Sequence, residues 1–267
     1  MYPRFITPDS KPFDPLWLAK ATEEIVTRMG KEGQERKYTD FYSVPVYRGI
    51  ATGYAVGCCL RCFYCWSPLS RDYPESYGEF YSPLRAFEKL VEAARRGIRY
   101  GPPHWRALPI RKCRISGCEP TIGREHLLSL LELVEGSDFE LFILETNGIL
   151  LGADKSYARA LSRFSKVHVR VSIKAGTPES FTRRTGAIGK YYELPFKALE
   201  YLLDAGVSCH AAAMTDPRIM RREERRLIIE RLAEIDRRLA RNLEEEVIDP
   251  YRTTLFRLRK AGVNVEW

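Results

Sequence analysis

Strand-like and helix-like segments alternate along most of the chain, and this alternation restricts the fold more than any other feature. Short apolar runs are separated by amphipathic stretches with helical spacing. Alternating strands and helices build right-handed βαβ units around a parallel sheet. Six such units fit the length of 267 residues, whereas the eight of a complete barrel do not. The predicted strands are 50–56, 112–116, 140–144, 167–173, 207–214 and 263–265.

The predicted helices lie between these strands, with one long basic helix after the fifth strand. They span 16–29, 83–99, 124–133, 157–164, 195–203, 221–243 and 252–260. The first 46 residues begin with several prolines and are charged and loop-like over 31–40. We therefore divide the α/β chain into an N-terminal extension, residues 1–46, and a barrel-type domain, residues 47–267.

Three cysteines stand close together directly after the first strand of this series. Cys58, Cys62 and Cys65 have the spacing Cys-x3-Cys-x2-Cys, and an aromatic residue follows them. A [4Fe–4S] cluster has four irons, and a closed structural site provides four cysteine thiolates. Three thiolates on one short loop therefore predict a cluster with one iron open to a substrate or a cofactor.

Other uses of the cysteines fit the sequence less well. A long chain without a secretory signal predicts a reducing compartment, where disulfides are rare. A zinc site needs a second pair of cysteines or histidines, and no such pair follows. A non-enzymatic iron–sulfur protein stays open as an alternative, with Cys59 or Cys118 as the fourth ligand. The cysteines expected to be free buried thiols are Cys59, Cys113, Cys118 and Cys209.

Polar segments that contain glycine or lysine follow three further strands. The carboxyl ends of parallel strands meet at one rim of the sheet, where the chemistry of βα folds gathers. Ser172 and Lys174 are two residues apart on a strand, so their side chains point to the same side. We expect one site to combine the cysteine loop with the segments Ser-Gly-Cys-Glu-Pro (116–120), Glu-Thr-Asn-Gly (145–148) and Ser-Ile-Lys (172–174).

In this order, the segments resemble the radical S-adenosylmethionine (SAM) superfamily, and within it the branch of pyruvate formate-lyase activating enzymes. The resemblance covers roughly residues 50–215 and implies a partial (β/α)6 barrel. It implies that Cys58, Cys62 and Cys65 bind a [4Fe–4S] cluster whose open iron is chelated by SAM. Reductive cleavage of SAM then produces methionine and a 5′-deoxyadenosyl radical, which abstracts hydrogen from a substrate.

The resemblance also implies which residues bind SAM. Residues 117–120 take the place of a Gly-Gly-Glu-Pro motif, whose backbone carbonyls and acidic side chain receive the SAM ammonium group. Cys118 stands where glycine is usual, and a Cβ conflicts with a positive φ angle. Tyr64 takes the aromatic position near the adenine. The residues expected at the SAM site are Tyr64, Gly117, Cys118, Glu119, Pro120, Asn147, Ser172 and Lys174.

The substrate stays open at this stage. An activating enzyme takes hydrogen from a glycine of a partner protein, but Ser172 stands where that branch carries aspartate. RNA or a small molecule is the alternative, and the basic stretch 221–241 is a candidate RNA footprint. Glutamates interleaved with its arginines also suit an ion-paired helix surface. We expect a large substrate, protein or RNA.

The remaining expectations concern the surroundings of the protein. The resemblance implies an external one-electron reductant of the flavodoxin or ferredoxin type. No stretch approaches the roughly 18 apolar residues that a membrane crossing needs. We therefore expect no membrane partner and a cytoplasmic location.

Overall fold

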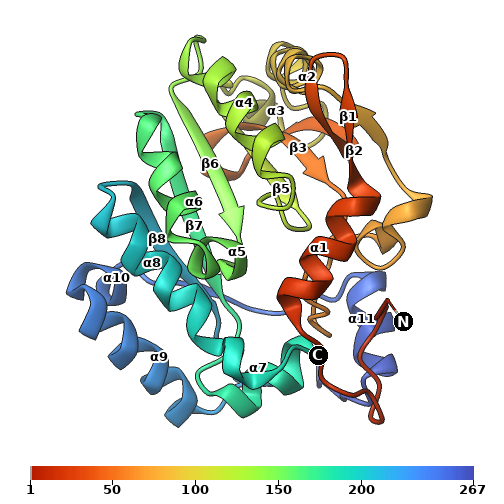
Figure 1. Cartoon of the computed structure of the whole chain (residues 1–267), viewed down its shortest axis with the longest axis vertical. Coiled ribbons are helices and arrows are strands. Elements are labelled where there is room, and N and C mark those ends of the chain that lie inside the picture. Colours follow the sequence, from red (N-terminus) through yellow and green to blue (C-terminus); the bar gives the residue numbers. More distant parts are fainter. Residues whose placement is uncertain (1) are drawn as a thin grey trace.

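Six parallel strands form the centre of the structure, a computed structural model that describes residues 2–267. Each strand pairs in parallel with the next, and the helices lie outside the curved sheet (Figure 1). This is the predicted partial (β/α)6 barrel. The parallel strands are β3 Ile50–Ala55, β5 Lys112–Gly117, β6 Leu141–Thr146, β7 Val167–Ile173, β8 Ser208–Met214 and β9 Glu244–Glu246.

The sheet is open, and antiparallel strands extend it at one edge. The strands β1 (Thr27–Gly30), β2 (Gly33–Val44) and β4 (Glu79–Tyr81) belong to this extension. β2 pairs antiparallel with β1, β3 and β4. At the other edge β9 pairs with β8, and within residues 2–267 it does not close onto the first strands.

The helices cover the outer face of the sheet (Figure 1). Side chains cap several of them, as Ser82 does for α2, which starts where the sequence predicts it, and as Thr177 does for α7, which was not predicted. Within residues 2–267 none combines the length and the hydrophobicity of a membrane span. The helices are α1 Pro15–Val26, α2 Pro83–Arg96, α3 Pro103–Arg106, α4 Arg124–Glu135, α5 Ile149–Ala153, α6 Lys155–Ala160, α7 Pro178–Thr185, α8 Leu194–Asp204, α9 Arg222–Ile235, α10 Arg237–Arg241 and α11 Arg252–Lys260.

The prediction of a charged loop at 31–40 is wrong, because this segment belongs to the long strand β2. Two of its charged residues, Arg36 and Lys37, are buried with backbone partners. Arg36 Nε donates to Ile122 O at 2.8 Å, and Lys37 Nζ donates to Pro74 O at 3.1 Å. Charge alone therefore does not mark an exposed segment, because backbone carbonyls can replace water as acceptors.

The prediction of a last strand at 263–265 is also wrong, and the sixth parallel strand is β9. The predicted long helix 221–243 ends early, because Asp236 interrupts it and caps α10 through Arg238 N at 2.7 Å. Three consecutive glutamates have little intrinsic strand preference. Ion pairs with Arg170 and Arg225 hold them at the edge of the sheet.

The short helix α5 packs against α8 through Gly152, and this contact supplies a test of the fold. Alanine usually favours a helix over glycine by about 1 kcal/mol. At position 152, however, a Cβ would lie 1.9 Å from the backbone oxygen of Leu194. Gly152→Ala should therefore lower the free energy of unfolding by about 1–3 kcal/mol in a denaturant titration.

Gly136 provides the matched control for this substitution. It follows α4 with a φ of −82°, and the nearest atoms to a Cβ there are 3.9 Å away. Gly136→Ala should leave the free energy of unfolding within about 0.5 kcal/mol of the wild type. Equal stabilities of the two variants would contradict the close packing of α5 on α8.

Candidate functional site

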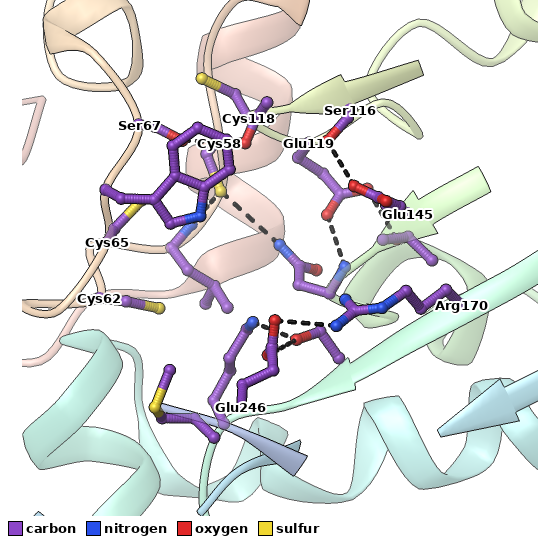
Figure 2. A pocket seen from close by; sticks show the side chains of 18 of the residues that line it. Cys58, Cys62, Cys65, Ser67, Ser116, Cys118, Glu119, Glu145, Arg170 and Glu246 are labelled. Atoms are coloured by element: carbon purple, nitrogen blue, oxygen red, sulfur yellow. Dashed lines mark hydrogen bonds and ion pairs between the residues drawn. The ribbon is translucent and has the colours of Figure 1, made fainter. Parts of the chain in front are cut away.

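The loop after β3 carries the three cysteines into the wall of a cavity at the carboxyl ends of the parallel strands (Figure 2). Cys62 is 7% exposed, while Cys58 and Cys65 are half-buried. Backbone hydrogen bonds join this loop to the end of α7, from Arg61 N to Thr185 O at 2.9 Å and from Phe63 N to Arg184 O at 3.1 Å. The backbone therefore sets the positions of the thiols before any ligand binds.

Polar strand ends form the opposite wall, and Figure 2 shows them facing the cysteines across the cavity. The structure thus brings together nearly all the residues that the sequence predicts at the site. Pro120 is the exception, since it does not line the cavity. The predicted SAM-site residues that do line it are Tyr64, Gly117, Cys118, Glu119, Asn147, Ser172 and Lys174.

The turn after β5 accommodates Cys118 without backbone strain. Gly117 takes the positive φ of 100°, and a Cβ there would lie 2.5 Å from the ring of Tyr54. Cys118 itself is not among the positive-φ residues of the described chain. The glycine that this turn requires is therefore the first of the pair, and a side chain is compatible with the second position.

Glu119 is fully buried, and its carboxylate ties two strand ends together. It accepts hydrogen bonds from Thr121 N and Oγ1 at 3.1 and 2.6 Å, from Thr146 Oγ1 at 2.7 Å, and from Asn147 N at 2.8 Å. Four donors occupy most of the acceptor capacity of a carboxylate. The side chain thus joins the turn after β5 to the end of β6.

Lys174 and Ser172 lie side by side at the end of β7, as their spacing predicts. Lys174 Nζ donates to Ser172 Oγ, which in turn lies 3.2 Å from Glu246 Oε2. Burial raises the pKa of Glu246, but Arg170 and Lys174 together hold it below its ordinary value. The group is therefore a carboxylate at neutral pH, and its charge compensates the two cations.

Two arginine–carboxylate pairs continue this polar surface along the strands. Arg170 donates to Glu244 at 2.9 Å and to Glu246 at 2.8 Å. Hydrogen bonds from His210 and Arg170 hold the pKa of Glu244 far below its ordinary value. In the second pair, Glu145 accepts from Arg114 and from Ser116, and Figure 2 shows the Ser116 contact.

Sequence reasoning missed most of these charged residues. Arg114 and Arg170 each lie two residues before a predicted site residue on the same strand, so the period-two alternation could have revealed them. Glu244 and Glu246 carry no such signal, because β9 itself was not predicted. The site is therefore more highly charged than the sequence motifs indicate.

The residues present fit a cubane cluster better than a single metal ion. No group of three His, Cys, Asp or Glu side chains in residues 2–267 is close enough to hold one ion. Thiolates of a cluster bind different irons, so they do not converge on one point. None of the cysteines is in a disulfide, and the buried hydroxyl of Tyr64 has no hydrogen-bond partner within residues 2–267. A free phenol at the cavity wall suits a further ligand beside a cluster.

A parallel α/β sheet with three thiols and polar strand ends at one rim defines a cofactor-dependent barrel enzyme. The model of the radical SAM superfamily matches residues 54–232, which is more than half of the chain. The chain therefore belongs to the radical SAM superfamily. Members of this superfamily are enzymes that use a [4Fe–4S] cluster and SAM, and this confirms the predicted class and cofactors.

Two curated relatives carry the same name but differ in length from this chain. GTP 3′,8-cyclase of Petrotoga mobilis is 30% identical over 130 residues, which cover 48% of this chain and 35% of the relative. GTP 3′,8-cyclase of Xanthomonas axonopodis pv. citri is 30% identical over 153 residues, which cover 57% and 41%. The matched region thus spans less than half of these relatives. Neither is named as an activating enzyme, so the predicted branch is not confirmed.

Solved structures support the fold. The structure of TYW1 with a lysine–pyruvate adduct bound has a TM-score of 0.53 at 18% identity, covering 76% of this chain and 66% of that one. Streptococcus suis SuiB bound to the precursor peptide SuiA has a TM-score of 0.56 at 14% identity, covering 86% and 41%. At these identities the similarity concerns the fold alone.

Substitution of single cysteines tests the ligand set. Anaerobically reconstituted protein should contain about four irons per chain, because three thiolates and SAM complete one cubane. Alanine at position 58, 62 or 65 should abolish iron binding, measured by iron analysis and visible absorption. Cys59→Ala and Cys118→Ala are the matched controls and should retain the cluster. Equal loss of iron in either control would indicate a fourth cysteine ligand.

Glu119→Gln tests the buried carboxylate. An amide would place an N–H donor against groups that already donate, and it would leave one of them without an acceptor. The free energy of unfolding of the apoprotein should fall by about 1–3 kcal/mol in urea titrations. Glu132→Gln is the control, because the Glu132 side chain is 60% exposed. Indistinguishable midpoints for the two variants would contradict the bridging role of Glu119.

Proposed function

We propose that this chain binds a [4Fe–4S] cluster through Cys58, Cys62 and Cys65 and cleaves SAM reductively to methionine and 5′-deoxyadenosine. The observation that carries the proposal is the position of the three thiols, which stand on one loop and face the polar strand ends across a single cavity. When bound, the reduced cluster and SAM supply one-electron cleavage and hydrogen abstraction.

The residues on the strand-end wall have separate proposed roles in holding SAM. Lys174 and Ser172 provide an ammonium and a hydroxyl for the SAM carboxylate and ribose. Tyr64 offers its unpartnered hydroxyl and its ring near the adenine. Because the Glu119 carboxylate is occupied by four internal donors, we assign the ammonium contact to backbone carbonyls of the turn at 117–119.

We further propose that the substrate is a small polar molecule. The cavity measures about 390 Å³, and it must also hold the cluster and SAM, so the space left inside it suits only a small molecule. Arg114, Glu145, Arg170 and Glu244 line it, and such charged side chains favour a ligand that can form hydrogen bonds with them. The curated relatives, named as cyclases of GTP, support a small molecule in the same way.

The basic stretch 221–241 offers little support for an RNA substrate. Arg225 pairs with Glu245 at 2.6 Å, and Arg231 pairs with Glu193 at 3.3 Å. Further pairs join other arginines of α9 and α10 to neighbouring carboxylates. Within residues 2–267 these pairs engage four of the eight arginines of the stretch and lower its net positive charge, which weakens its attraction for phosphates.

A protein substrate is the second candidate. The segment 145–148 and the stretch 172–186 resemble activating enzymes, which take hydrogen from a glycine of a partner protein.

Superfamily members need an external electron donor, and we propose a flavodoxin or a ferredoxin. We also propose a reducing compartment such as the cytoplasm, because all seven cysteines are free thiols.

One experiment tests both the cleavage of SAM and the proposal that the substrate is a small molecule. Reconstituted protein is reduced with dithionite and incubated with SAM, and 5′-deoxyadenosine is measured by chromatography with mass spectrometry. Cell extract from the native host, grown in heavy water, is separated by ultrafiltration into a small-molecule filtrate and a macromolecular fraction. Each fraction is added to a separate reaction. The added SAM is unlabelled, so a single deuterium in the 5′-deoxyadenosine formed from it comes only from the fraction that contains the substrate, whereas host SAM would contribute several deuterium atoms. Deuterated GTP serves as a defined probe.

We expect 5′-deoxyadenosine from SAM in every sample, with deuterium only when the filtrate is present. The Cys62→Ala variant should produce none and is the control. A fully loaded cluster that yields no 5′-deoxyadenosine would disprove SAM cleavage. Deuterium transfer from the macromolecular fraction would disprove the small substrate, and its loss after protease or ribonuclease treatment would identify protein or RNA.

A further inference from the structure

Three buried arginines surround the cysteine loop, and each donates to the backbone carbonyl of a different proposed ligand cysteine. Arginine side chains are rarely this deep in a protein unless several acceptors surround them. The three pairs, with their Nη1–O distances, are Arg61 and Cys58 at 2.7 Å, Arg71 and Cys62 at 2.6 Å, and Arg257 and Cys65 at 2.6 Å.

All three arginines are almost completely buried, so other groups must compensate their charges. Arg61, Arg71 and Arg257 are 0%, 2% and 1% exposed. Desolvating a cation costs several kcal/mol unless other groups compensate it. Most of the acceptors here are carbonyls of the cysteine loop itself, including Ser67 O and Pro68 O for Arg257. The carbonyls of the loop therefore replace water around the buried guanidinium groups, and these hydrogen bonds fix the backbone that carries the three thiols.

The charges of this group do not cancel. Asp72 is fully buried and pairs with both Arg71, at 2.5 Å, and Arg257. Arg61 has no carboxylate within ion-pair distance in residues 2–267. Its other hydrogen bonds go to carbonyls, Pro3 O at 2.6 Å from Nε and Leu60 O at 2.8 Å, and its guanidinium lies over the Tyr2 ring at 5.1 Å from the centroid. Three cations and one anion leave net positive charge beside the thiols, in a region from which water is largely excluded.

The two ends of the chain close this region. Arg257 comes from α11, while Pro3 lies in the N-terminal segment. Phe5 packs edge-on against Phe256 with 5.3 Å between ring centroids, and Figure 1 shows the red N-terminal segment beside the blue α11. Low local dielectric strengthens electrostatic interactions, so charge in this closed region acts on the thiols with little screening.

We propose that Arg61, Arg71 and Arg257 are positioning residues for the [4Fe–4S] cluster, and that together with Asp72 they raise its reduction potential. This rests on the proposed assignment of Cys58, Cys62 and Cys65 as ligands. A cluster held by three thiolates is anionic and gains further negative charge on reduction. Net positive charge nearby favours the reduced form, because cluster potentials depend on local charge, hydrogen bonds and solvent exposure.

The test uses variants that change the charge in opposite directions. Arg61→Gln removes a positive charge, Arg61→Lys keeps it, and Asp72→Asn removes the negative charge. Arg226→Gln is the matched control, because Arg226 lies on α9 and is 72% exposed. The midpoint potential of each reconstituted protein is measured by redox titration followed by electron paramagnetic resonance. Iron release to a chelator is timed in parallel.

Arg61→Gln should shift the midpoint to more negative values and Asp72→Asn to less negative values, while Arg61→Lys and Arg226→Gln stay close to wild type. Iron release should accelerate about tenfold in Arg257→Gln, as when outer partners of metal ligands are removed. If Arg61→Gln takes up no cluster while Arg61→Lys does, the holding role is supported directly.

Two results would overturn the inference. One is a midpoint of Arg61→Gln equal to that of wild type, and the other is a shift of Asp72→Asn in the same direction as Arg61→Gln. A wild-type protein that binds no cluster at all would instead refute the proposed function. The failure of the inference and the failure of the proposed function are therefore distinguishable.

Discussion

The ion pairs of the buried Asp72 carboxylate connect the segment after the cysteine loop to the C-terminal helix α11. Asp72 follows the cysteine loop and pairs with Arg71 beside it and with Arg257 from the last helix. Through Arg257 the C-terminal helix also reaches the carbonyls of Cys65, Ser67 and Pro68. A buried carboxylate is retained where it is fully paired, since an unpaired charge at this depth is strongly destabilising. The geometry of the cysteine loop is thus coupled to the packing of the C-terminal helix.

The second organising constraint is the parallel sheet, which brings polar strand ends to the same rim. β5, β6 and β7 are neighbours in register, so the turns that follow them converge although they are far apart in sequence. Glu119 joins two of these turns through its hydrogen bonds to Thr146 and Asn147. The cavity therefore has one wall of thiols and one wall of rigidly held polar groups, as an enzyme needs to orient a cofactor beside a substrate.

The charged interior distinguishes this barrel from one that is filled with apolar side chains. Arg170 pairs with Glu244 and Glu246, and Arg114 with Glu145. Paired charges of both signs favour ligands that form hydrogen bonds with their remaining donors and acceptors, whereas an apolar molecule would remove water from these groups without replacing it. This surface is the physical basis for proposing a polar substrate, and it lies directly beside the residues assigned to SAM.

The sequence by itself determined the parallel α/β class, five of the six parallel strands and the cysteine motif, because hydrophobic periodicity and short motifs are local properties of the chain. It also placed Ser172 and Lys174 on the same face of one strand. It could not reveal β9, whose glutamates form a strand only because arginines from β7 and α9 pair with them. Nor could it reveal the link between Arg257 and Cys65, which are separated by 192 residues and meet only in the folded chain. Contacts of this kind were decided by tertiary structure, because the burial of a charge depends on which distant groups supply its partners.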